Sequence, residues 1–199
     1  QRQMCIRDRL SSQSLEEYIL TDTDTYLVVF VNGQYSKELS SVDDKHACIC
    51  SLAEAEEKEP EILKKYWGSC LPENPDSLVA LNSALSKNGA FIYVPKNKLV
   101  EKPIQILYIT NEVSADLFLQ TRNLIVVEEN SQVQITERHQ NFDSKEVFTN
   151  ALTEINVATN SIVDYYKIQN DKYNCSLIDN TWVNPVSYTH LTLPTMAIV

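Results

Sequence analysis

Three residues with soft metal-binding side chains alternate in the segment His46-Ala47-Cys48-Ile49-Cys50. Alternate residues of a β-strand point to the same side, so His46, Cys48 and Cys50 would share one face if this segment is extended. Imidazole and thiolate groups bind zinc and the iron of iron-sulfur clusters. One hypothesis is therefore a small metal-binding module. Isolated thiols are also common as small buried side chains, which is the competing interpretation.

A second group of reactive side chains is acidic and consists of Glu128, Glu129 and Glu137, the last followed by Arg138 and His139. Acid–base catalysis on glycosidic bonds requires paired carboxylates, and β-solenoid enzymes carry them on adjacent turns. A second hypothesis is therefore a carbohydrate-active enzyme that uses Glu128, Glu129 and Glu137. Charged residues at strand ends and turns are also often plain solvated surface.

Composition excludes several other functions. The chain has 199 residues, 17 basic and 27 acidic side chains and a net charge of −10. An acidic chain repels the phosphate backbone, so we expect no nucleic-acid partner. With 43% apolar and 22% charged residues, we expect a globular protein without membrane association. The three glycines, Gly33, Gly68 and Gly89, are too widely spaced for a phosphate-binding loop or a nucleophile elbow.

The elements that must position these residues are mixed in the first half of the chain. Residues 26–31 form an apolar run, and Asn32-Gly33 then predicts a tight hairpin with residues 35–39 as the returning strand. Residues 47–51 predict another short strand. Residues 52–67 predict a helix that is interrupted at Pro60.

A further helix is predicted after Asp76, whose side chain is a suitable N-terminal cap. Spacings of three and four residues predict an apolar face, and Asn88-Gly89 predicts its end. That face consists of Leu78, Leu81, Ala84 and Leu85.

After Gly89 the pattern changes to short β-like runs without intervening helices. The seven runs are 91–94, 104–109, 124–127, 133–135, 152–157, 162–168 and 177–182. Such a series predicts a sandwich, a barrel or a β-solenoid, and the spacing alone does not choose among them.

Both ends of the chain differ in character from the rest. Residues 1–9 hold three arginines, and residues 186–199 contain no charged side chain. Both resemble translated sequencing adapters, so we expect 1–9 and 186–199 to be non-native. The predicted organisation is a mixed helical and strand subdomain over 10–88, followed by a β-rich region over 89–185.

Four segments in the middle of the chain resemble the SufB/SufD family, and within it the SufD subunits. They are LVVFVNGQYSKELS (27–40), DSLVALNSALSKNGAFIYVPKNKLVEKPIQI (76–106), RNLIVVEENSQVQITERHQ (122–140) and NALTEINVATNSIVDYYKIQND (150–171). The resemblance implies a mainly β fold in which a small mixed N-terminal subdomain precedes a right-handed parallel β-helix. It also implies that this chain is an internal piece of a longer protein.

The family resemblance implies a scaffold without enzyme activity, located in the cytoplasm, that takes part in iron-sulfur cluster assembly. Its expected partners are SufB, through the β-helix, and the SufC ATPase, through a C-terminal segment that lies beyond this chain. The cluster would be held transiently by the whole complex. We therefore assign no catalytic, cofactor-binding or metal-binding residue to this chain. Four cysteines outside residues 1–9, at irregular spacings, also favour a reducing compartment.

Overall fold

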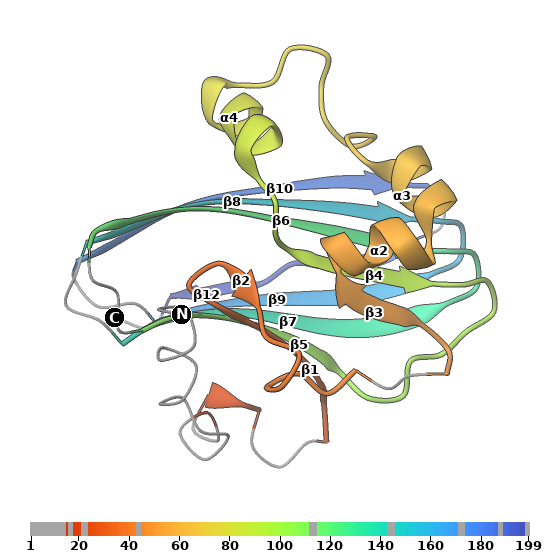
Figure 1. The fold of residues 1–199 in the computed structure, drawn as a ribbon. Helices are drawn as coiled ribbons and strands as arrows, with labels where there is room; N and C mark the ends of the chain where they lie inside the picture. The colour runs from red at the N-terminus through yellow and green to blue at the C-terminus, as the bar shows by residue number, and fades with distance from the viewer. Residues whose placement is uncertain are drawn as a thin grey trace.

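A computed structural model of the chain describes residues 15, 18–20, 24–42, 45–111, 115–142, 146–170, 174–186 and 189–197. Its strands form two sheets that lie face to face (Figure 1). The first sheet contains β1 (Tyr26–Val31), β2 (Gln34–Tyr35), β5 (Ile104–Thr110), β7 (Gln132–Asn141), β9 (Ile162–Asn170), β11 (His190–Thr192) and β12 (Thr195–Ala197). The second contains β3 (Cys48–Ser51), β4 (Ala90–Val94), β6 (Leu117–Val127), β8 (Val147–Val157) and β10 (Cys175–Pro185).

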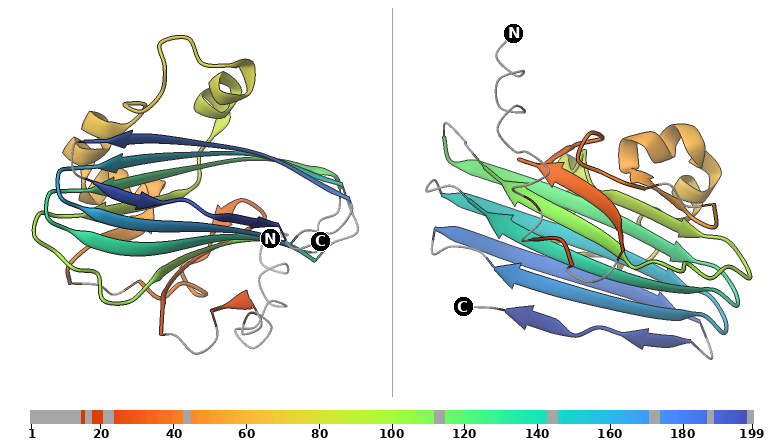
Figure 2. Two further views of the ribbon diagram at one scale, coloured as in Figure 1. Left: turned by 180° about the vertical axis from the view of Figure 1, so that it is seen from behind. Right: turned by 90° about the horizontal axis from the view of Figure 1, so that it is seen from below.

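From β4 to β10, successive strands alternate between the two sheets, and each pairs in parallel with the strand one turn later. Leu117 of β6 pairs with Val147 of β8, and Gln132 of β7 pairs with Ile162 of β9. Figure 2 shows the strands side by side along the solenoid. Each of the seven predicted runs lies in one of these strands. The fold is therefore a parallel β-helix, as the family resemblance implied, rather than a sandwich or a barrel.

One corner of the solenoid repeats the same turn three times. Asn97, Asn130 and Asn160 all adopt positive φ angles, of 59°, 58° and 59°. Asn160 donates a side-chain hydrogen bond to Asn130 at 2.8 Å, and Asn130 donates to Asn97 at 3.0 Å. Asparagine tolerates the left-handed conformation because its short side chain bonds locally. This asparagine ladder fixes the turns of the solenoid in register.

The predicted hairpin forms, but its returning strand is shorter than expected. Asn32 and Gly33 take φ angles of 50° and 75°, and β2 pairs antiparallel with β1 over only two residues. The Ser40 hydroxyl then accepts a hydrogen bond from the Val29 amide at 3.0 Å. A side chain thus satisfies the backbone donor, and the predicted strand over 35–39 ends at Tyr35.

Three helices cover the outer face of the second sheet (Figure 1): α2 (Leu52–Lys58), α3 (Pro60–Tyr66) and α4 (Ser77–Leu85). The predicted break falls at Pro60, which occupies the first turn of α3, where its missing N–H costs nothing. The predicted cap also forms, because the Asp76 carboxylate accepts hydrogen bonds from the amides of Leu78 and Val79.

The predicted apolar face and end of α4 are wrong. The buried side chains are Val79 and Asn82, whereas Leu85 is 50% exposed. Asn82 takes a core position because its amide donates to the carbonyl oxygens of Thr121 and Asn150, at 2.9 and 2.8 Å. These bonds attach α4 to β6 and β8 through polar contacts, which a search for apolar spacing overlooks. The helix ends at Leu85, before Asn88-Gly89.

The first half of the chain contributes β1 and the edge strand β2 to the first sheet, and the edge strand β3 to the second. β1 pairs in parallel with β5, and β3 pairs antiparallel with β4. The segment 1–9 lies outside the described residues, and β11 and β12 in the predicted non-native tail pair with β9. The domain borders at residues 10, 89 and 186 stay predictions. Among the described residues, no helix is long and apolar enough to cross a membrane.

Candidate functional site

The interior between the sheets changes from apolar to polar along the strands. Near the asparagine ladder it is filled by a buried apolar core that includes Ile135, Ile125 and Ile155. Further along β7, the residues on the same face are Glu137 and His139, both buried. One strand therefore supplies both an apolar and a charged stretch to the same interior.

Glu137 is the centre of the polar stretch and has no exposed surface. Its carboxylate accepts hydrogen bonds from the Asn123 amide at 3.0 Å and from the Tyr165 hydroxyl, and it lies 2.8 Å from His139 Nε2. Burial by itself would raise the pKa of Glu137. The positive charge of Lys167 and the interaction with His139 outweigh burial and hold this pKa at about 2. Glu137 is therefore an ionised carboxylate inside the solenoid.

Lys167 and Asp179 complete the charged interior. The Lys167 ammonium lies 2.5 Å from both carboxylate oxygens of Asp179 and 3.9 Å from Glu137 Oε2. Burial, followed by the negative charge of Glu137, raises the pKa of Asp179. Lys167 is only 8% exposed, whereas the Asp179 side chain is 23% exposed. The buried Lys167 ammonium thus lies close to two carboxylates, and Asp179 on β10 is the member of the group that is partly exposed to solvent.

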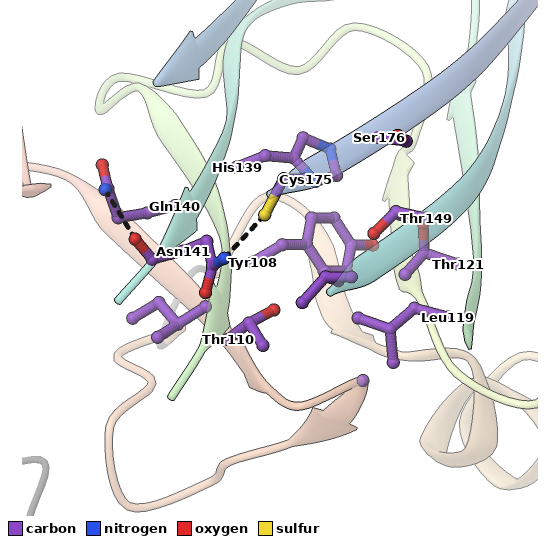
Figure 3. A pocket seen from close by; sticks show the side chains of 13 residues that line it. Tyr108, Thr110, Leu119, Thr121, His139, Gln140, Asn141, Thr149, Cys175 and Ser176 are labelled. Carbon is purple, nitrogen blue, oxygen red and sulfur yellow. Dashed lines mark hydrogen bonds between the residues drawn. The ribbon is translucent and has the colours of Figure 1, made fainter. Parts of the chain in front are cut away.

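A small cavity adjoins this charged group, with a volume of about 20 Å³. Its lining includes Tyr108, Thr121, His139, Asn141 and Cys175, which come from both sheets (Figure 3). The Asn141 amide donates to the Cys175 sulfur at 2.6 Å, and the buried Thr121 hydroxyl has no hydrogen-bond partner among the described residues. A polar cavity of this size holds about one water molecule. It has no room for a sugar or a nucleotide.

A second buried ion pair lies on the outer face of the second sheet. Arg122 and Glu154 are 1% and 0% exposed, and their closest nitrogen and oxygen are 2.5 Å apart. The Arg122 guanidinium stacks 4.0 Å from the centre of the Trp67 ring. Glu154 also accepts from the backbone amides of Gly68 and Cys70, at 3.1 and 3.3 Å. This pair therefore fastens the loop after α3 to β6 and β8.

Gly89 makes this arrangement possible by allowing two backbones to approach closely. A Cβ atom at Gly89 would lie 1.5 Å from the carbonyl oxygen of Arg122. Any side chain at position 89 would therefore displace β6. The function of this glycine is close approach, not the helix end that its position after α4 predicts.

The three glutamates of the enzyme hypothesis do not form one site. Glu137 faces the interior, whereas Glu129 is exposed and pairs with Lys96 at 3.1 Å. Glu128 accepts a hydrogen bond from the Tyr66 hydroxyl of α3 at 3.1 Å, on the outer side of the sheet. The geometry therefore does not supply the paired carboxylates that this hypothesis needs.

The structure brings together two of the three residues of the metal-binding hypothesis. Cys48 and Cys50 share a face of β3, with their sulfur atoms 3.8 Å apart. His46 is exposed in a bend before this strand. Across the described residues, no group of three or more His, Cys, Asp or Glu side chains is arranged to hold a metal ion.

The sequence reasoning named Glu137 but missed its cation and the second ion pair. Lys167 lies 30 positions after Glu137, directly beside it across β7 and β9. The asparagines at 97, 130 and 160 could have revealed these pairings, because they recur at the spacing of one solenoid turn. Aligning the chain on them would place position 167 beside 137 and 154 beside 124.

Family comparisons agree with this architecture. A family model described as the SufBD protein N-terminal region matches residues 16–106. A second, described as the SufBD core domain of the SUF system for FeS cluster assembly, matches residues 108–195. The two matches follow one another along nearly the whole described chain.

Individual relatives carry the same family name. A chloroplastic iron-sulfur cluster assembly SufBD family protein of Arabidopsis thaliana is 32% identical over 61% of this chain. Relatives from Staphylococcus aureus and Synechocystis are 30% and 27% identical over 70% and 81% of it. The chain spans only 22%, 31% and 38% of the lengths of these three proteins.

The fold, with its two parallel sheets and its helices on one outer face, places the chain among the parallel β-helix proteins. The two family models then make the assignment specific. The chain belongs to the SufBD family of the SUF system for iron-sulfur cluster assembly.

Proposed function

We propose that this chain is part of a SufD-like scaffold that acts in iron-sulfur cluster assembly by forming a complex with SufB and the SufC ATPase. The observation that carries the proposal is the consecutive match to the N-terminal and core regions of the family. The proposed protein has no enzyme activity of its own and acts in the cytoplasm. The iron-sulfur cluster is a cargo of the assembled complex.

The solenoid geometry supports a role in holding partners. Its parallel strands stack one turn on the next in two continuous sheets. Such stacked turns form extended surfaces that bind other proteins. In this proposal, SufB joins the protein through the β-helix, and SufC binds a C-terminal segment outside this chain.

The charged interior supports a structural role. Glu137, Lys167 and Asp179 connect β7, β9 and β10, and the adjoining cavity has space for about one water molecule. Buried charges need partners in fixed positions, so this group keeps three strands in one register. A scaffold that transmits force from an ATPase needs such a rigid connection.

Co-purification tests the proposal. The full-length protein that contains this chain is expressed with SufB and SufC of the same organism, with an affinity tag on the SufD-like protein only. We expect all three to elute together in size-exclusion chromatography after affinity purification. Elution of the tagged protein alone, with SufB and SufC shown to be folded and present in the lysate, would contradict the proposal.

A further inference from the structure

The two thiols of β3 form a pair that lies outside the charged interior. Cys48 and Cys50 are two residues apart on the strand, and their sulfur atoms are 3.8 Å apart. Cys50 is fully buried, whereas Cys48 is partly exposed. β3 is the edge strand of the second sheet and lies beside α2 (Figure 1). Cys48 is therefore the sulfur that a small ion in solvent can reach directly.

The surroundings of the pair are apolar. Cys50 packs in a buried cluster with Leu52, Ala55, Phe91, Leu124 and Val126, and Cys48 lies against this cluster. Cys48 is the thiol at the partly exposed rim of the pair, and Cys50 lies among the apolar side chains beneath it.

A disulfide fits this pair poorly. Two residues along a strand separate the Cα atoms by about 6.6 Å, close to the upper limit for a disulfide. The sulfurs would also have to approach from 3.8 Å to about 2.05 Å. Cys48 and Cys50 are held in register opposite Tyr93 and Phe91 of β4, so the strand resists this movement. The pair therefore favours an ion that bridges the two sulfurs without joining them.

The number of ligands selects the kind of ion. Zinc prefers four ligands, but no third His, Cys, Asp or Glu in the described part of the chain is placed to complete a site with this pair. Thiolates select soft ions, and Cu(I) is satisfied by two or three of them. Metal–thiolate bonds of about 2.3 Å span a gap of 3.8 Å as a bent bridge.

We propose that Cys48 and Cys50 form a binding site for a soft monovalent cation, with Cu(I) as its chemical type. Both thiols bind as thiolates, so uptake of one Cu(I) releases up to two protons and involves no change of oxidation state. The bound site carries one net negative charge.

Anaerobic titration of the chain with Cu(I), in competition with the chromophoric chelator bathocuproine disulfonate, tests this site. All proteins carry Cys5→Ser, which removes a thiol outside the described residues. The test variant is Cys48→Ser, at the partly exposed position, and the buried position is tested separately by Cys50→Ala. The matched control is Cys70→Ser, because Cys70 is also partly exposed but has no thiol beside it among the described residues, and it bonds to the Ile155 carbonyl. Far-UV circular dichroism confirms that each variant is folded.

We expect one tightly bound Cu(I) per chain in the parent and in Cys70→Ser. Loss of an outer-sphere partner alone weakens metal binding by about 10–100-fold, so loss of one of two ligands in Cys48→Ser should cost more than about 100-fold. Unchanged affinity in Cys48→Ser, equal losses in Cys70→Ser, or stronger binding of Zn(II) than of Cu(I) would overturn the proposal. The outcome does not depend on SufB or SufC, so it is separate from the test of the proposed function.

Discussion

The two ends of the solenoid interior are built from the same strands but are stabilised in different ways. At the end near the asparagine ladder, Ile125, Ile135 and Ile155 are fully buried and belong to one apolar cluster. At the other end, Glu137 and Lys167 occupy equivalent inward positions on β7 and β9. A register slip of two residues keeps apolar side chains in the interior, because side chains alternate with a period of two and apolar contacts are not directional. The same slip separates a buried charge from its partner and leaves it unpaired.

This difference explains how a repetitive fold can be stable and also have a single pairing register between its strands. The apolar end supplies the driving force for stacking, and the charged end penalises every alternative pairing of β7, β9 and β10. Four changes test this division, in order of expected effect on stability.

The largest effect is expected from Lys167→Met. This change leaves Glu137 fully buried without its cation and removes both contacts to Asp179. Removing one partner of a buried ion pair costs about 3–5 kcal/mol, so we expect a loss of this size in urea unfolding at pH 7. Lys96→Met is the matched control, because Lys96 pairs with Glu129 at the exposed surface. Equal stability of the two variants would contradict a special role for the charged interior.

The next effect is expected from Ile155→Ala at the apolar end. Ile155 has no exposed surface, and truncating such a side chain costs about 2–5 kcal/mol through lost burial and a new cavity. Because no charge is involved, the loss should be the same at pH 7 and pH 4. The control is Leu99→Ala, since Leu99 is 54% exposed. A loss that changes strongly with pH would show that the two ends are not independent.

Acid should act on the charged end alone. The pKa of Glu137 is lowered from 4.5 to about 2 in the folded state, so below pH 4.5 the unfolded state binds more protons. The stability that Glu137 contributes is therefore present above about pH 4.5 and is lost as the pH falls toward 2. The raised pKa of Asp179 acts in the opposite direction and reduces the slope.

Urea midpoints measured from pH 6 to pH 2 check this sign. The parent should lose stability over that window, and Glu137→Gln should show a flatter curve. Glu146→Gln serves as the control for one carboxylate fewer, because Glu146 is exposed. A Glu137→Gln curve as steep as that of the parent would mean that Glu137 is not ionised in the folded interior.

The smallest effect is expected in the asparagine ladder. Asn130 has φ of 58°, so Asn130→Ala adds backbone strain of about 1–2 kcal/mol to the loss of the ladder bonds. Asn130→Gly removes the same bonds without adding strain at this φ, so it should cost less. Thermal unfolding of both variants separates the two contributions. Equal melting temperatures would show that the positive φ carries no strain in this turn.

Local signals in the sequence predicted the elements well. The cap at Asp76, the break at Pro60 and the turn at Asn32-Gly33 depend on neighbouring residues only, and all three form. The buried face of α4 was missed because Asn82 is held by carbonyl groups of β6 and β8, which are 39 and 68 positions away. A side chain that is buried through hydrogen bonds leaves no pattern of apolar residues in the sequence.

The candidate site was predictable only in part, for the same reason. Glu137 stands out as a charge on an alternating strand, but its partner Lys167 becomes a neighbour only through the 30-residue turn. Arg122 and Glu154 meet through the register of β6 and β8. The recurrence of asparagine at positions 97, 130 and 160 was a periodic signal of this turn. Cys48 and Cys50 were predictable as a pair because they lie on one strand.

Genetic complementation tests the central proposal most directly. The full-length protein containing this chain is expressed in two bacterial strains, one lacking SufD and one lacking SufB, and the activity of an iron-sulfur enzyme is measured under conditions that require the SUF system. We predict that activity returns in the strain lacking SufD and stays absent in the strain lacking SufB. Restoration only in the strain lacking SufB would contradict the SufD-like role, and restoration in neither, with the protein shown to be soluble, would contradict the proposed scaffold function.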